Sequence, residues 1–250
     1  TLYSLARPYQ RDVAGHDYEV IVVDNGSQPP FPHDVLCSLG PQFRLLRPAH
    51  PSVSPASAVN AGVLAARADR LCIMIDGARL VTPGLMAAMI EAARLHRDCV
   101  LTAPGWHLGP DLQWRSRLAG YDEAVEDALL AGADWMCDGY ALFGIGVPGA
   151  SSTTGPFAPM AESNTLGMSR THFAQLGGMD ERFDLPGGGY VNLDLYRRAL
   201  SAPDARLVVL AGEASFHQLH GGISTNSTPD ERGTYDAAAR AQYLSLRGEP

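Results

Sequence analysis

The stretch Leu71-Cys72-Ile73-Met74-Ile75-Asp76-Gly77-Ala78 decides the fold class of this chain. Its five consecutive apolar residues, bounded by charge and glycine, are typical of a parallel strand covered on both faces. The strand ends in Asp76, and in open α/β sheets ligands bind outside the carboxyl ends of the strands. We therefore expect Asp76 to lie in a crevice, where it is a candidate for holding a nucleotide, a metal ion or both.

Further strands and helices alternate around this stretch. Strands are predicted at 18–24, 43–47, 98–103 and 206–210, and helices at 54–65, 82–97, 121–133, 191–200 and 229–247. Alternation of strands and helices of this length indicates βαβ units. The expected fold class is therefore α/β, with a mostly parallel, Rossmann-like central sheet flanked by helices. The Gly/Pro/Ser-rich stretch 144–159 is longer than ordinary connections, which predicts a functional or mobile segment.

The 250 residues favour one domain, with segments 1–104 and 105–228 and a C-terminal helix (229–250). Residues 1–5 resemble the middle of a helix, so we expect a first strand upstream of them, and the chain could belong to a larger polypeptide.

Composition excludes some classes of partner. The net charge of −8 argues against nucleic-acid and anionic-membrane surfaces, which favour clustered Lys and Arg. No apolar run reaches the roughly 18 residues of a membrane span. The four scattered cysteines fit reduced thiols, which predicts a cytoplasmic location.

Four segments in order make the chain resemble family 2 glycosyltransferases of the GT-A fold over residues 1 to about 220. They are Val22-Val23-Asp24-Asn25-Gly26-Ser27, Asn60-Ala61-Gly62, Ile75-Asp76-Gly77-Ala78 with Pro83-Gly84, and Ser169-Arg170 through Gly177-Gly178-Met179-Asp180-Glu181. The resemblance implies transfer of a sugar from a nucleotide-diphosphate donor to a hydroxyl acceptor, such as a glycan or polysaccharide precursor. It also implies Mn²⁺ or Mg²⁺ as cofactor. The same resemblance implies a nucleotide-binding half for 1–104 and an acceptor and metal half for 105–228.

The resemblance implies nucleotide contacts for Asp24, Asn25, Asn60 and Asp76. A carboxylate at a strand end accepts hydrogen bonds from N–H or hydroxyl donors of a base or ribose. Two alternatives remain open. Asp24 could merely close the Asp-Asn-Gly turn, and Asn60 could be an ordinary amide on a helix surface.

The metal motif departs from the family pattern. The family usually ends this strand with two acids, Asp-x-Asp, whereas here the second position is Ala78. His217 and His220 are candidates to complete a metal shell with Asp76. They could instead hydrogen-bond phosphate or acceptor, or be structural.

The catalytic base is the least defined role. The position that holds the base in inverting members falls on Asn192, whose amide cannot take a proton, and Asp194 is the nearest carboxylate. Asp194 could instead form a salt bridge with Arg197 or Arg198.

Other residues remain candidates around the acceptor. Glu162 or Asp180 could act as the base, and Glu162 and Arg170 are candidates for contacts to the acceptor or diphosphate. Three further alternatives are a retaining reaction, a catalytically silent domain that binds nucleotide sugars or carbohydrate, and a nucleotidyltransferase.

Overall fold

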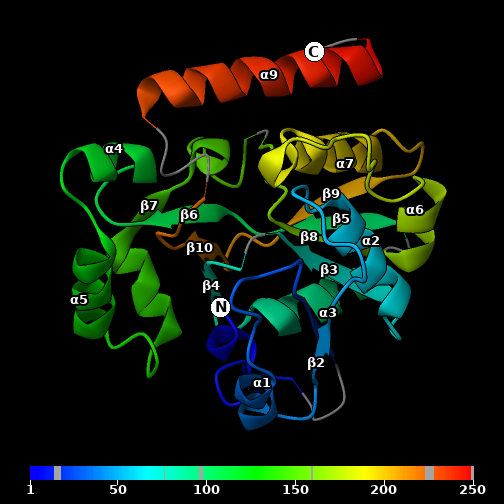
Figure 1. Cartoon of the computed structure of the whole chain (residues 1–250). Coiled ribbons are helices and arrows are strands. Elements are labelled where there is room, and N and C mark those ends of the chain that lie inside the picture. Colours follow the sequence, from blue (N-terminus) through cyan, green and yellow to red (C-terminus); the bar gives the residue numbers. More distant parts are fainter. Residues whose placement is uncertain (14–17, 76, 96–97, 159, 223–227, 249–250) are drawn as a thin grey trace.

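The computed structural model describes residues 1–13, 18–75, 77–95, 98–158, 160–222 and 228–248. Helices surround centrally placed sheets (Figure 1). The strands are β1 (Val20–Val23), β2 (Phe43–Leu46), β3 (Arg70–Met74), β4 (Arg79–Val81), β5 (Cys99–Thr102), β6 (Gly105–Leu108), β7 (Gly146–Pro148), β8 (Thr165–Ser169), β9 (Arg206–Val209) and β10 (Ser215–His217). The helices are α1 (His33–Leu39), α2 (Ala56–Ala65), α3 (Leu85–Leu95), α4 (Gln113–Leu118), α5 (Glu123–Ala133), α6 (Arg170–Gln175), α7 (Val191–Leu200) and α9 (Pro229–Arg247).

Strand β5 forms the centre of the core, in a sheet ordered β3-β8-β5-β9. All four of its residues are buried. Val100 packs in a cluster with residues of α2, α6 and α7, whereas Cys99 and Leu101 pack in a second cluster with residues of α3. Successive side chains of a strand point to opposite faces, so the apolar run of β5 is covered by helices on both sides.

The sheets are mixed, which corrects the expectation of a mostly parallel sheet while the α/β class is confirmed. Strand β8 runs antiparallel to both neighbours, β3 and β5, whereas β5 and β9 are parallel. In the second sheet, ordered β4-β10-β6-β7, only β10 and β6 are parallel. The physical reason is the connection between β5 and β8, which contains β6, α4, α5 and β7 in place of the single helix of a βαβ unit. The chain therefore enters β8 beside the end of β5 and runs antiparallel to it.

Strands β1 and β2 form a separate parallel pair. A largely apolar cavity of about 980 Å³ lies between β1 and β3, with α2 and α3 contributing to its walls. The strand expected upstream of Thr1 stays a prediction.

The Gly/Pro/Ser-rich stretch 144–159 contains regular structure where it is described. It includes β7, the end of a 3₁₀ helix (Gly139–Ile145) and another 3₁₀ helix (Ala150–Ser152). The four cysteines are free thiols. Over the described part of the chain, no helix combines the length and apolarity needed to cross a bilayer.

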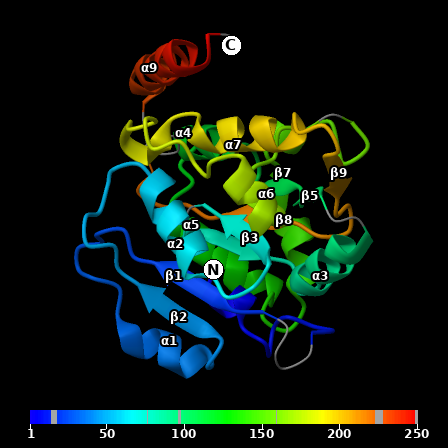
Figure 2. The same cartoon turned by 90° about the vertical axis from the view of Figure 1, so that its right-hand side faces the viewer.

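Helix α9 lies at one end of the molecule, and α1 with β2 lies at the other (Figures 1 and 2). Helix α9 begins at a capping box, in which the Thr228 side chain accepts from the backbone N–H of Glu231 and the Glu231 carboxylate accepts from the backbone N–H of Thr228. Its Tyr243 is buried in the same core cluster as Leu195 of α7. The helix is therefore part of the packed structure.

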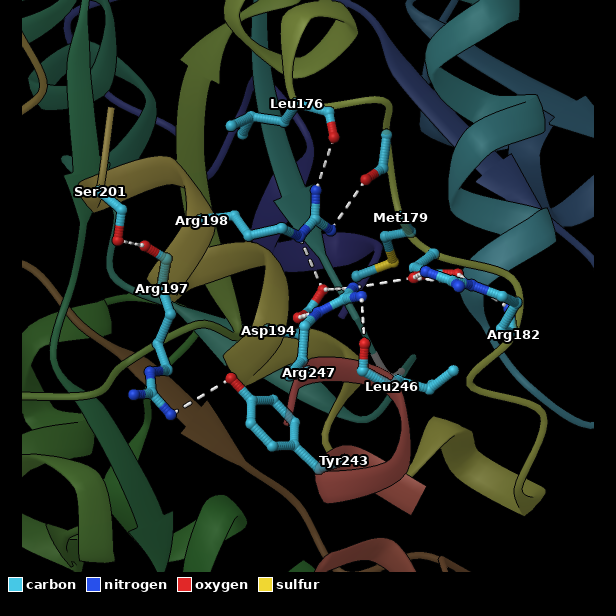
Figure 3. A network of polar contacts seen from close by, with 12 residues as sticks. Leu176, Met179, Arg182, Asp194, Arg197, Arg198, Ser201, Tyr243, Leu246 and Arg247 are labelled. Carbon is cyan, nitrogen blue, oxygen red and sulfur yellow. Dashed lines mark hydrogen bonds and ion pairs between the residues drawn. The ribbon is translucent and has the colours of Figure 1, made fainter. Parts of the chain in front are cut away.

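An ion network fastens the end of α9 to α7 (Figure 3). Arg247 donates through Nε to Asp194 Oδ1 (2.5 Å) and through Nη2 to Asp194 Oδ2 (2.9 Å). The same Nη2 reaches Asp180 Oδ2 at 2.8 Å. Asp194 is 1% exposed, so its charge depends on these guanidinium partners.

We predict that Arg247→Ala destabilises the fold strongly. The change leaves the buried Asp194 carboxylate with Arg198 as its remaining guanidinium partner, and breaking a buried pair costs on the order of 3 kcal/mol. Urea unfolding monitored by circular dichroism measures this difference. Arg240→Ala, an exposed position on the same helix, is the matched control and should change stability by less than about 0.5 kcal/mol. Equal stability of the two variants would contradict the role of the network.

Candidate functional site

The candidate site lies where β10 meets the start of β4 and Ala78, which directly precedes β4. The backbone N–H of Gln218 donates to the carbonyl of Ala78 (2.8 Å), and His217 lies opposite Arg79 in the β4–β10 register. Asp76 itself lies outside the described residues. The turn of residues 217–220, called here the histidine turn, therefore borders the segment that directly follows Asp76 in the chain.

The two predicted histidines of this turn lie close together. Nε2 of His217 and Nε2 of His220 are 3.1 Å apart, and His217 is 6% exposed. Two nitrogen ligands at right angles, each about 2.1 Å from one cation, lie about 3.0 Å apart. The His217–His220 contact is a hydrogen bond between the two rings, and two adjacent ligands of one six-coordinate cation would have a similar spacing. The described residues contain no set of three His, Cys, Asp or Glu side chains that could hold a metal, so further ligands would have to come from elsewhere.

Three residues around the histidine turn were not predicted from the sequence, and of these Gln113 and Glu126 are buried whereas His107 is half-buried. His107 on β6 lies beside His217, with 5.7 Å between ring centroids, and burial lowers its pKa to about 4. Gln113, at the start of α4, contacts the rings of His107 and His217. Glu126 on α5 accepts from the backbone N–H of Leu219, and burial raises the pKa of its carboxyl. These contacts join segments far apart in sequence, so local patterns could not reveal them.

Asp24 closes the loop that follows β1. Its Oδ1 accepts from the backbone N–H of Ser27 (2.9 Å) and its Oδ2 from the N–H of Phe31 (3.0 Å). Arg47 also donates to Oδ2 at 3.3 Å. These contacts of Asp24 are the ones expected if its carboxylate closes the Asp-Asn-Gly turn. Hydrogen bonds from Ser27, followed by those from Phe31 and Arg47, lower the pKa of Asp24 from 3.8 to about 2.

Asn25 connects this loop to the Pro/Ser-rich segment before α2. Its side-chain amide donates to the carbonyl of Ser52 (2.6 Å) and accepts from the Ser52 N–H (3.1 Å). Both Asp24 and Asn25 therefore shape the loops at the carboxyl end of β1.

Asn60 and Arg170 contact other parts of the molecule. The Asn60 amide accepts from the backbone N–H of Met179 and donates to the Met179 carbonyl and to the Glu181 carboxylate. These bonds hold the Gly177-Gly178-Met179 segment against α2. Arg170 donates to the carbonyl of Ala66 and to Asp69. Since Asp69 directly precedes β3, Arg170 lies at the end of that strand opposite to Asp76.

Glu162 lies buried between the end of β5 and the start of β6. It accepts from Ser151 Oγ (2.6 Å) and from the backbone and side-chain nitrogens of Asn164 (2.8 and 2.9 Å). A Cβ at Gly105 would lie 2.2 Å from its Oε2, so a larger residue there would force the Glu162 carboxylate to shift. Glu162 is thus a fully hydrogen-bonded group, 1% exposed, rather than an open one.

The two base candidates of α7 differ in their contacts. Both oxygens of Asp194 accept from guanidinium groups, since Arg198 donates to Oδ2 (2.7 Å) in addition to Arg247. Asp180 shares this network, and hydrogen bonds from Arg182 and then Arg247 hold the pKa of its carboxyl well below the usual range. Asn192 Oδ1 is buried without a hydrogen-bond partner among the described residues. The salt-bridge alternative thus accounts for the contacts of Asp194, with Arg198 and Arg247 as partners.

Three of the solved structures similar to this chain contain UDP or UDP-GlcNAc. S. aureus TarS (residues 1–349) in complex with UDP has 14% identity and a TM-score of 0.53, with 98% of this chain and 67% of that chain covered. Its complex with UDP-GlcNAc has 15% identity and a TM-score of 0.55, with 97% of this chain and 61% of that chain covered. GalNAc-T7 with UDP, GalNAc and Mn²⁺ has 11% identity and a TM-score of 0.53, with 96% of this chain and 48% of that chain covered. The chain thus spans about half to two thirds of these proteins, and at such identities the likeness shows the fold alone.

No curated protein matches the chain. The sequence model of glycosyl transferase family 2 matches residues 1–144, which is more than half of the chain. Together with the α/β architecture shared with the solved structures, this match establishes that the chain belongs to glycosyl transferase family 2 and has the GT-A fold.

Proposed function

We propose that this chain transfers a sugar from a nucleoside-diphosphate donor to a hydroxyl acceptor. The observation that carries the proposal is the histidine turn, whose paired Nε2 atoms lie beside the segment that follows Asp76. Membership of family 2 supports the nucleotide-sugar donor and leaves no ground for the nucleotidyltransferase alternative. The UDP, UDP-GlcNAc and GalNAc complexes of the similar structures make UDP-linked N-acetylhexosamines the first donors to test.

His217, His220 and Asp76 would hold a divalent cation in this proposal. Imidazole nitrogens suit hard Mg²⁺ poorly, so Mn²⁺ is the ion of choice, and Mn²⁺ is present in the GalNAc-T7 structure. When bound, the cation acts as a Lewis acid that stabilises the charge of the departing diphosphate. Ala78 contributes no ligand from its side chain, which makes the histidines the replacement for the second acid of the family motif.

The remaining roles follow from the contacts at the site. Asp24 and Asn25 order the loops at the end of β1, where the nucleoside would bind. We assign the acceptor side to the segment around Glu162, whose Asn164 and Ser151 partners offer polar groups. Asp194 and Asp180 serve to anchor α9. The acceptor would be a glycan or polysaccharide precursor, with the chain acting as part of a larger polypeptide.

One observation favours a second candidate function, a catalytically silent domain that binds nucleotide sugar. Asn192 occupies the position expected for the base, and the nearest carboxylate, Asp194, is held by two arginines. Neither group as arranged here is suited to accept a proton from an acceptor hydroxyl. Turnover measurements distinguish the two functions.

We predict that Mn²⁺ strengthens UDP binding through Asp76 and the histidine turn. Calorimetric titration of UDP should give higher affinity with Mn²⁺ than with EDTA. Asp76→Ala or His220→Ala should remove about tenfold or more of this gain, because each loses a ligand. His33→Ala, an exposed histidine on α1, is the control and should retain it. Equal UDP affinity with and without Mn²⁺ in the wild type would refute the site.

Donor turnover without acceptor tests the chemistry. We expect slow release of UDP from one member of a panel of UDP-sugars, including UDP-GlcNAc, when Mn²⁺ is present, because water can replace the acceptor hydroxyl. Coupled detection of UDP measures the rate, and His220→Ala should abolish it. Tight donor binding with no release in Mn²⁺, Mg²⁺ or Zn²⁺ would instead establish the silent binding domain.

We predict a pH-dependent contribution of Asp24 to stability. Because the folded pKa of about 2 lies below the ordinary 3.8, the ionised carboxylate stabilises the fold above about pH 4. This stabilisation is lost as the pH falls from about 4 towards 2. The difference in urea midpoint between wild type and Asp24→Asn should therefore be largest at neutral pH and shrink below pH 4. A difference independent of pH between 7 and 3 would contradict this assignment.

A further inference from the structure

The histidine turn is held from outside by two buried residues, Gln113 and Glu126. Gln113 is the first residue of α4 and is 0% exposed, and Glu126 of α5 is 4% exposed. Neither side chain belongs to the strands that carry the histidines. Their contacts with the turn bear on its chemistry, because second-shell partners fix the tautomer and orientation of a ligating histidine.

Gln113 contacts two histidine rings with different groups. Its backbone N–H donates to Nδ1 of His107 (2.9 Å), so Nδ1 of His107 is the acceptor and its proton is on Nε2. Its side-chain Oε1 lies 2.5 Å from Nδ1 of His217. In this orientation of the Gln113 amide the contact is made by a carbonyl oxygen, which only accepts, and this orientation assigns the His217 proton to Nδ1.

The tautomer of His217 determines what Nε2 can do. With the proton on Nδ1, Nε2 of His217 is the acceptor nitrogen, and Nε2 of His220, 3.1 Å away, donates to it. A cation that binds both atoms would displace this proton. An imidazole can ligate a cation only through an unprotonated nitrogen. The hydrogen bond to Gln113 therefore prepares the nitrogen that belongs to the Nε2 pair, whereas the opposite tautomer would block it with a proton.

Glu126 fixes the backbone between the two histidines. Both of its carboxylate oxygens lie 3.0 Å from the N–H of Leu219, and the hydroxyl of Tyr121 donates to Oε2 at 3.2 Å. Leu219 directly precedes His220, so this clamp sets where the second ring points. A charged acceptor for a backbone N–H makes a stronger hydrogen bond than a neutral one.

We propose that Gln113 and Glu126 are positioning residues that prepare the histidine turn for a divalent cation, Gln113 by setting the His217 tautomer and Glu126 by fixing the Leu219 amide. The inference rests on the proposed function for its cation. The tautomer itself is a property of the cation-free chain. The two parts can therefore fail separately.

Nuclear magnetic resonance of the ring nitrogens tests the tautomer in the cation-free full chain. Nδ1 of His217 should be protonated in the wild type and in Gln113→Glu, whose carboxylate still accepts. In Gln113→Leu the population protonated on Nε2 should rise, because the acceptor is lost. Wild-type His217 protonated mainly on Nε2, or a tautomer unchanged in Gln113→Leu, would overturn the role of Gln113.

Electron paramagnetic resonance of free Mn²⁺ measures the consequence, with and without UDP. Gln113→Leu and Glu126→Ala should weaken Mn²⁺ binding roughly 10- to 100-fold, and Gln113→Glu and Glu126→Gln should restore most of it, since both keep an acceptor oxygen. Gln42→Leu, which removes a buried glutamine outside this cluster, is the matched control and should leave Mn²⁺ affinity unchanged. Circular dichroism melts confirm that each variant is folded.

The outcomes separate the two proposals. If His220→Ala loses Mn²⁺ while Gln113→Leu and Glu126→Ala bind it as tightly as the wild type, the positioning role is overturned and the metal site stands. If the wild type itself binds no Mn²⁺, the metal site falls, and the nitrogen spectra alone then support or overturn the assignment of Gln113.

Discussion

Strand β5 is buried on both faces, and this constraint sets the position of the other layers. A strand without an exposed face needs apolar cover from two sides, which α7 with α2 supplies through Val100 and α3 through Cys99 and Leu101. Its neighbours β8 and β9 complete its hydrogen bonds. At its carboxyl end, Thr102 donates to the carbonyl of Glu162 (3.0 Å), so the core strand also places the buried carboxylate near the proposed acceptor side.

The buried charge of Asp194 explains why α9 is attached to the core. A carboxylate that is 1% exposed needs guanidinium partners, and Arg198 from its own helix supplies only part of them. Arg247 completes the pairing from the end of α9 (Figure 3). It also donates to Asp180. The same contacts occupy both oxygens that a catalytic base would use. In this chain the carboxylate therefore anchors α9.

The histidine turn is assembled from separate parts of the chain. Strand β10 carries His217 between β4 and β6, α4 brings Gln113 to one side of the ring, and α5 brings Glu126 to the turn after it. Each contact satisfies a polar group that burial would otherwise leave unpaired. In our proposal, the same arrangement sets the His217 tautomer and presents two nitrogens to a cation where the family pattern has a second acid.

The sequence by itself determined the local elements and the family. Apolar runs and caps placed helices at 191–200 and 229–247 where α7 and α9 lie, and the ordered motifs around Asp24, Asn60 and Asp180 identified the glycosyltransferase resemblance. Local hydrogen bonding and hydrophobic periodicity suffice for such features. Only the tertiary structure decided the antiparallel direction of β8 and the partners of buried polar groups. Arg247 lies 53 residues from Asp194, and Gln113 lies 104 from His217. Contacts over such separations leave no periodic trace in the sequence, because they arise only when packing brings the segments together.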